Sequence, residues 1–113
     1  MHVGIDLVKI SRFENVKHLD KIFTKKELLY LEKNYNHKET IAGMYAAKEA
    51  FLKAMKKGIH QCSLLDIEIL HHADKVPFIL LHGQLKKETP YSDIEVSISH
   101  DGDYATAIVL LTD

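Results

Sequence analysis

The segment "IAGMYAAKEAFLKAM", Ile41 to Met55, decides the fold of this chain. Its larger apolar residues recur at helical spacing and, at about 100° per residue, form one broad arc: Ile41, Met44, Tyr45, Phe51, Leu52 and Met55. The pattern predicts a long helix from Lys38 to Lys57 that ends at Gly58, a residue suited to the left-handed position after a helix. Because so broad an apolar arc must be buried, we expect this helix at the centre of the molecule.

Charged residues interrupt the long helix. Lys48 falls inside the apolar arc, so either its side chain bends to the surface or its charge faces an anion at the bottom of a cleft. Glu49 and Lys53 have the i, i+4 spacing of a helix-surface ion pair that contributes about 0.3–0.5 kcal/mol. Ala42 and Ala46 share their side of the helix, and such small residues let another backbone or a ligand come close. The pattern therefore fits either a surface pair or a binding site.

Two segments before the long helix carry clear local signals. "HVGIDLV", residues 2–8, alternates and is rich in branched residues, so it predicts a first strand with Asp6 near its end. "TKKELLYLEKNY" opens with Thr24 and has Glu27 three residues later, the capping box that begins a helix. Inside the long helix, Gly43 costs up to ~1 kcal/mol against alanine unless close packing requires it.

The period changes after the long helix. "DIEILHH" and "VPFILLHG" predict two strands separated by "ADK", and "IEVSISH" and "YATAIVLL" predict two more around "DGD". The predicted fold class is therefore α+β, with an N-terminal strand, helices including one long central helix, and an antiparallel β meander. Since no repeat or linker is visible, we predict one domain over residues 1–113.

Composition narrows the classes of function. A formal net charge of −1 gives no reason to expect nucleic acid, and no apolar run approaches the ~20 residues of a membrane span. The N-terminus carries an acid within a short apolar run and does not read as a signal peptide. The single Cys62 cannot form an intrachain disulfide, so we expect a cytoplasmic location.

Charge is distributed unevenly near the N-terminus. Six basic residues stand against two acids there: Lys9, Arg12, Lys17, Lys21, Lys25 and Lys26 against Glu14 and Asp20. This excess is either an ordinary solvated helical surface or a docking patch for an acidic partner.

Asp6 and Glu49 are candidate metal ligands. Asp6 sits either on an exposed strand face at no cost or at a strand end where it serves a metal or a substrate. If it converges with Glu49, two hard carboxylates form half of a magnesium site that water and phosphate oxygens complete. Lys48 and Lys53 would then supply charge for a phosphate group.

His100 is a further candidate site residue. It faces the same side of its predicted strand as the apolar residues Val96 and Ile98, so it is either a core histidine or a group that binds phosphate or relays a proton.

Taken together and in order, these segments resemble the holo-acyl-carrier-protein synthases, short single-domain members of the 4′-phosphopantetheinyl transferase superfamily. The resemblance covers nearly the whole chain and lies in "GIDLVKISRF", "FTKKELLYL", "IAGMYAAKEAFLKAM", "DIEIL" with "KVPFILL", and "VSISHDGDYATAIVL". It implies the fold of that superfamily. It also implies transfer of the phosphopantetheine arm of coenzyme A to a serine of an apo acyl carrier protein in fatty acid biosynthesis, with release of adenosine 3′,5′-bisphosphate.

The resemblance also implies roles for single residues. Asp6 and Glu49 match the family's magnesium ligands, Lys53 matches a lysine near the phosphates, and Arg12 matches the arginine of a basic first helix that docks the acidic carrier protein. We predict Asp6, Glu49 and Lys53 as catalytic residues; either Glu49 or a metal-bound water would accept the serine proton. The predicted coenzyme A site contains Lys48, Lys53, Lys56, Ser99 and His100. Members of this type form homotrimers with active sites at subunit interfaces.

The chain departs from the family pattern at three places, of which the last is expected to affect a turn more than the chemistry. Relatives usually have arginine at the position of Met44, a Leu-Gly-Thr-Gly segment in place of Met55 to Gly58, and Gly-Lys-Pro in place of Lys75 to Pro77. They leave open whether Lys56 and Lys57 bind the nucleotide or only end the helix. They also permit an alternative function, a protein on the same scaffold that binds carrier proteins or nucleotides without catalysis.

Overall fold

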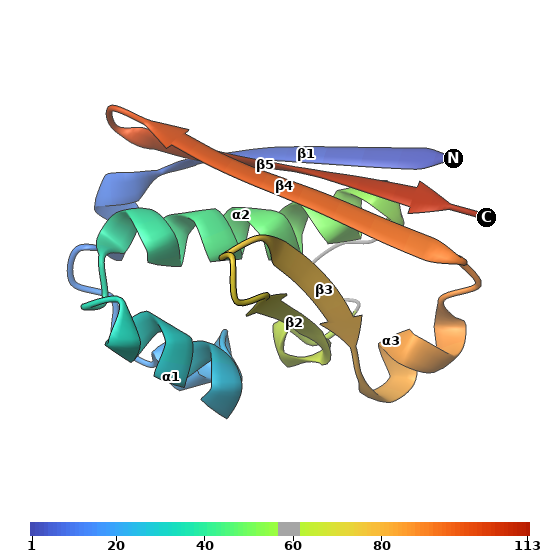
Figure 1. Ribbon diagram of the computed structural model, residues 1–113, viewed down its shortest axis with the longest axis horizontal. Helices are drawn as coiled ribbons and strands as arrows, with labels where there is room; N and C mark the ends of the chain where they lie inside the picture. The colour runs from blue at the N-terminus through green and yellow to red at the C-terminus, as the bar shows by residue number, and fades with distance from the viewer. Residues whose placement is uncertain (57–61) are drawn as a thin grey trace.

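Helix α2 (Lys38–Ala54) lies at the centre of the fold, between a sheet and a layer of smaller elements (Figure 1). The computed structural model describes residues 1–56 and 62–113. Along the chain the elements are β1 (His2–Lys9), the 3-10 helices η1 (Ile10–Phe13) and η2 (Leu19–Lys21), α1 (Lys25–Lys33), α2, the 3-10 helix η4 (Leu64–Asp66), β2 (Ile67–His71), β3 (Pro77–Leu81), α3 (Gly83–Glu88), β4 (Asp93–Asp101) and β5 (Tyr104–Thr112). Within these ranges no helix is long and apolar enough to cross a membrane.

The strands form two antiparallel sheets. One has three strands in the order β1-β5-β4, and the other is the β2-β3 hairpin. This confirms the predicted α+β class, the long helix and both predicted hairpins. The strands do not form one continuous meander, because α3, which we did not predict, separates β3 from β4, and β1 pairs along β5.

Helix α2 is buried on nearly every side. The three-stranded sheet covers one side, and α1 with the β2-β3 hairpin lies on the other (Figure 1). Ala42 and Ala46 are fully buried. Other parts of the protein therefore pack against both alanines, and the prediction that they leave space for a ligand is wrong.

Two glycines set how closely the edge strands approach α2. A Cβ on Gly4 of β1 would lie 1.9 Å from the Ala50 carbonyl oxygen of α2, so only glycine fits there. A Cβ on Gly43 of α2 would lie 2.7 Å from Ile98 of β4. Close packing against Ile98 therefore explains why α2 has a glycine at position 43 despite the lower helix stability that glycine brings. Each contact lies close to a candidate site residue on the same strand. Gly4 is two residues before Asp6 on β1, and Ile98 is two residues before His100 on β4.

The long helix ends three residues earlier than predicted. Its last residue is Ala54, Met55 is its C-cap, and Lys56 follows with φ +61°. The backbone N–H of Lys56 donates to the Lys53 carbonyl at 3.0 Å. A left-handed residue after a helix is usually glycine, so Lys56 occupies the conformation that we expected of Gly58. Lys57 and Gly58 lie outside the described residues.

We expect Lys56→Gly to stabilise the fold, because glycine adopts a positive φ without the steric cost that a Cβ brings. The gain should be about 0.5–1 kcal/mol, which raises the melting temperature of a domain this small by roughly 3–6 °C. Thermal unfolding followed by circular dichroism measures it. Lys56→Ala removes the same charge and keeps a Cβ; an equal rise in that variant would show that charge, not backbone conformation, is the cause.

The predicted capping box at the start of α1 is confirmed. The Glu27 backbone N–H donates to the Thr24 hydroxyl at 3.2 Å, and the Thr24 N–H donates to the Glu27 carboxylate at 2.8 Å. Before it, the basic stretch forms the short helices η1 and η2 in place of one regular helix.

Candidate functional site

Strand β1 and helix α2 bring together two of the predicted site residues, Asp6 and Lys53. The Lys53 ammonium donates to the Asp6 carboxylate at 2.9 Å. The Asp6 side chain is 13% exposed and that of Lys53 is 54% exposed, so the pair lies at the rim of the packed core. Glu49 is half-buried one helical turn before Lys53. We call Asp6, Glu49 and Lys53 the carboxylate cluster.

Tyr45 joins the carboxylate cluster to η1. Its ring packs on Phe13 with centroids 5.2 Å apart, and the Arg12 guanidinium carbon lies 5.5 Å from the Tyr45 ring centroid. Burial, and then the nearby Glu49 carboxylate, raise the pKa of the Tyr45 phenol. Arg12 itself is exposed. The predicted carrier-binding arginine and the predicted metal ligand therefore flank the same aromatic ring.

His100 lies in a different place, beside the β4 edge of the sheet. A hollow of about 280 Å³ opens there, which we call the β4 pocket. Its lining comes from five elements (α1, α2, β2, β3 and β4) and the turn before β3: Tyr30, Glu39, Thr40, Gly43, Met44, His71, Lys75, Pro77, Ile98 and His100. His100 is exposed, so the reading of it as a core histidine is wrong. Two of the departures named above, Met44 and Lys75, line this pocket.

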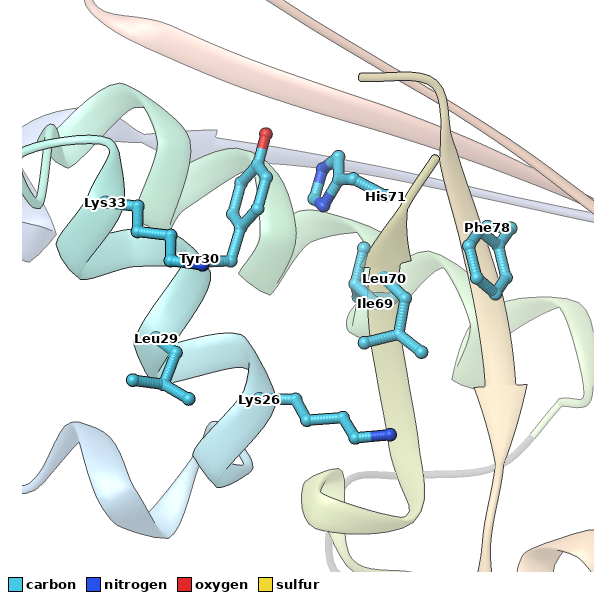
Figure 2. A pocket seen from close by; sticks show the side chains of 8 residues that line it. All are labelled: Lys26, Leu29, Tyr30, Lys33, Ile69, Leu70, His71 and Phe78. Atoms are coloured by element: carbon cyan, nitrogen blue, oxygen red, sulfur yellow. The ribbon is translucent and has the colours of Figure 1, made fainter. Parts of the chain in front are cut away.

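A stacked pair of rings separates the β4 pocket from a second hollow. The rings of Tyr30 and His71 are parallel with centroids 3.8 Å apart, and both line both hollows. Figure 2 shows the second one, where the Lys26 and Lys33 side chains come from α1 and Phe78 comes from β3. Burial lowers the pKa of His71, and its Nδ1 has no hydrogen-bond partner within the described part of the chain. The lowered pKa favours the neutral form of the His71 ring, which lines both hollows.

A single chain does not bring His100 to the carboxylate cluster. Asp6 is on β1 and His100 is on β4, and these strands are the two edges of the sheet with β5 between them. Ser99 faces the opposite side of β4 from His100, is exposed, and does not line the β4 pocket. Within one chain, the residues that were predicted to form one site therefore lie in two separate places, and Ser99 belongs to neither.

Lys48 is not available to coenzyme A. Its ammonium donates to the Ile22 carbonyl, the Glu27 carboxylate and the Leu64 carbonyl, each at 2.8 Å, and its side chain is 0% exposed. An ammonium has three donors, and all three are used inside the protein. Burial raises the pKa of Glu27 and lowers that of Lys48, while their mutual contact opposes both shifts. The prediction that Lys48 bends to the surface or faces an anion at the bottom of a cleft is wrong, because its anionic partner is the buried Glu27.

Three residues were missed or underrated by sequence reasoning. Glu27 appeared only as a helix cap, although its carboxylate also accepts from the Ile69 N–H at 2.9 Å and from Lys48. Tyr45 appeared only as part of the apolar arc, and its i, i+4 spacing to Glu49 was the available signal. Lys75 appeared only as part of a turn.

The carboxylate cluster fits a divalent metal as half of a site. Two hard carboxylates with an accessible rim suit magnesium, which usually keeps several waters and binds substrate phosphates. Among the described residues no group of three or more His, Cys, Asp and Glu side chains could hold a metal ion by itself. Water and substrate oxygens would have to supply the other ligands.

Comparison with known proteins gives a consistent result. The family model of the 4′-phosphopantetheinyl transferase superfamily matches residues 2–109. The holo-[acyl-carrier-protein] synthase of Finegoldia magna is 39% identical over 120 residues, covering 96% of this chain and 92% of that protein.

Two solved structures are similar along almost their whole length. The Helicobacter pylori holo-[acyl-carrier-protein] synthase in complex with coenzyme A has a TM-score of 0.87 and 32% identity, covering 97% of this chain and 99% of that one. The enzyme from Bacillus anthracis in complex with CoA (3′,5′-ADP) has a TM-score of 0.82 and 30% identity, covering 97% and 94%.

Proposed function

Since this chain belongs to the 4′-phosphopantetheinyl transferase superfamily, we propose that it is a holo-[acyl-carrier-protein] synthase that transfers the 4′-phosphopantetheine arm of coenzyme A to a serine of an apo acyl carrier protein. The observation that carries the proposal is the carboxylate cluster, where Asp6 and Lys53 meet at 2.9 Å beside Glu49. The reaction releases adenosine 3′,5′-bisphosphate. We further propose that residues 1–113 act as one domain, in the cytoplasm, in fatty acid biosynthesis.

In the proposed reaction the serine oxygen forms a bond to the phosphorus that carries the pantetheine arm. The bond from that phosphorus to the bisphosphate leaving group breaks, and the serine proton is lost. Lys53, whose ammonium is exposed at the rim, stabilises the charge that develops on the phosphate oxygens. We propose Glu49, whose side chain is hydrogen-bonded to Tyr45, as the residue that takes the proton.

Asp6 and Glu49 would hold a magnesium ion at the carboxylate cluster. When bound, the ion supplies positive charge that neutralises the pyrophosphate and makes the bisphosphate a better leaving group. The Lys53 ammonium holds the Asp6 carboxylate in position through a hydrogen bond of 2.9 Å.

The carrier protein would dock on the exposed η1 and η2 segments. Arg12 of η1, held over the Tyr45 ring, presents positive charge on the same ring that Glu49 contacts. An acidic carrier would be drawn to this surface by a fast, salt-sensitive association and would deliver its serine beside Glu49.

We propose a homotrimer with active sites at the subunit interfaces. Along the outer face of β1, Val3, Ile5 and Leu7 are 59%, 61% and 64% exposed, and Ile108 of the adjoining β5 adds to this apolar surface. Contiguous exposed apolar residues usually mark a protein interface. An assembly through the sheet would also allow the β4 pocket of one subunit to complete the carboxylate cluster of another.

We expect Ile5→Asp to give a folded monomer that lacks transferase activity, because a buried carboxylate cannot be accommodated at an apolar interface. Size-exclusion chromatography with light scattering measures the assembly, and circular dichroism confirms the fold. Leu29→Asp, on an exposed apolar residue of α1, is the matched control and should leave assembly intact. If Ile5→Asp has the same mass in solution as the unaltered protein, the β1 face is not the interface.

One assay tests the proposed function. The protein is incubated with coenzyme A, magnesium and apo acyl carrier protein, and the carrier is weighed by mass spectrometry. A mass gain of one phosphopantetheine group is expected. If no gain appears over hours while coenzyme A still binds, the alternative of a non-catalytic binding protein is the correct one.

A further inference from the structure

The second hollow, shown in Figure 2, has no part in the proposed transfer reaction. It has a volume of about 340 Å³ and lies between α1 and the β2-β3 hairpin, and we call it the α1 hollow. Helix α1 contributes one face to it, with the i, i+3, i+4, i+7 spacing of Lys26, Leu29, Tyr30 and Lys33. The volume lies within the range of about 300–1,000 Å³ that is usual for small-molecule sites.

The walls of the α1 hollow are apolar. Leu29 of α1 is 56% exposed, and Leu70 of β2 and Phe78 of β3 are half-buried on the side of the hairpin (Figure 2). Burial lowers the pKa of His71, so its neutral ring adds no charge to these walls. Apolar side chains that are left open to water around a hollow are typical of a surface that an apolar ligand covers.

Two lysines flank these apolar walls. Lys26 and Lys33 are seven residues apart, about 10 Å along the axis of α1. Lys26 already interacts electrostatically with the buried Glu68 carboxylate. Within residues 1–56 and 62–113, no carboxylate lies at ion-pair distance from the Lys33 ammonium, and no acid lines the hollow. The exposed Lys33 can therefore receive an anion from outside the chain.

Apolar walls with a cation at one end are complementary to a molecule with an apolar chain and an anionic head. We propose that the α1 hollow binds a free single-chain carboxylic acid, with its chain between Leu29 and Phe78 and its carboxylate on Lys33. A phospholipid bilayer also presents anionic heads, but it keeps its chains within the membrane and would leave the hollow unfilled. The inference goes beyond the proposed transferase function and does not depend on it.

The test is a titration of the full chain, labelled with ¹⁵N, followed by NMR. Octanoate is the probe, and octan-1-ol and acetate supply the chain without the charge and the charge without the chain. We expect octanoate to shift the amide signals of α1 and of the β2-β3 hairpin. The other two compounds should bind at least tenfold more weakly, because each lacks one of the two interactions.

Matched variants separate the charge from the apolar contact. Lys33→Met keeps an unbranched apolar side chain, lacks the cation and should weaken octanoate binding about tenfold, whereas Lys33→Arg should keep the affinity. Leu29→Asp should weaken binding further, because it removes an apolar wall and adds a repelling charge. Lys25→Met removes a lysine of the same helix that does not line the hollow and should change nothing. Circular dichroism confirms that each variant is folded.

Three outcomes would overturn the inference. One is equal octanoate affinity in Lys33→Met and in the unaltered protein. Another is a set of shifted signals that lies on the β1 face around Ile5 in place of α1 and the hairpin. The third is binding to vesicles of anionic phospholipid without binding of octanoate. Because no measurement needs turnover, failure of the carrier-protein mass assay would overturn the proposed function and leave this inference standing.

Discussion

Lys48→Met is expected to lower the free energy of unfolding by about 3–5 kcal/mol, the largest stability effect of any single substitution considered for this chain. The substitution keeps an unbranched apolar side chain one atom shorter than that of lysine, and it removes the ammonium with its charge and its three hydrogen bonds. Glu27 would then keep a buried carboxylate that has lost its cation, while the Ile22 and Leu64 carbonyls would lose their donor. Urea unfolding at neutral pH measures the change.

Two further variants show that the cost comes from the unpaired charge. Lys53→Met makes the same substitution on the same helix, but Lys53 is 54% exposed and its loss should cost less than ~1 kcal/mol. Glu27→Gln combined with Lys48→Met removes both charges and should recover much of the stability that Lys48→Met loses. A Lys48→Met protein as stable as the original would show that Glu27 is satisfied by its backbone donors alone.

Glu49→Gln is expected to reduce transfer by about a thousandfold with the fold retained. The substitution removes charge at nearly constant shape, so it weakens the proposed metal site and removes the proposed proton acceptor. The electrostatic stabilisation at stake is several kcal/mol, and each ~1.4 kcal/mol is a factor of ten in rate. The carrier-protein mass assay gives the rate, and a series of magnesium concentrations shows whether the variant needs more metal than the unaltered enzyme.

Glu32→Gln is the matched control, since Glu32 is an exposed acid on α1 away from both halves of the site. It should leave both the rate and the magnesium dependence unchanged. Thermal unfolding of Glu49→Gln should match that of the unaltered protein within about 1 kcal/mol, because Glu49 is only half-buried. If Glu49→Gln has activity close to that of the unaltered protein, Glu49 is not part of the active site and belongs only to a helix-surface pair.

The prediction was most successful where the signal is local. Strand β1, the capping box of α1, the start of α2 and both hairpins follow from alternation, helical spacing and turn residues, which act over a few neighbours along the chain. The family resemblance placed Asp6 and Lys53 in the same site although they are 47 positions apart, but it did not predict the ion pair between them.

The failures concern charges whose partners are distant in sequence. Lys48 was seen to lie on an apolar face, but Glu27 is 21 positions earlier and the Leu64 carbonyl is 16 later, so no local pattern pairs them. The end of α2 was misplaced because Gly58 is the better residue for a left-handed position, yet the chain leaves the helix at Lys56.

The sequence by itself determined the elements of this protein and the residue types available for phosphoryl transfer, because both depend on local spacing and on chemistry that a motif preserves. Only the tertiary structure decided which side of α2 each charge faces. It buried Lys48 on Glu27, left Lys53 at the rim with Asp6, and placed His100 at the opposite edge of the sheet. The strands that carry Asp6 and His100 approach α2 closely at Gly4 and Gly43, and Lys48 meets Glu27 and Leu64; all are contacts between segments that lie far apart along the chain.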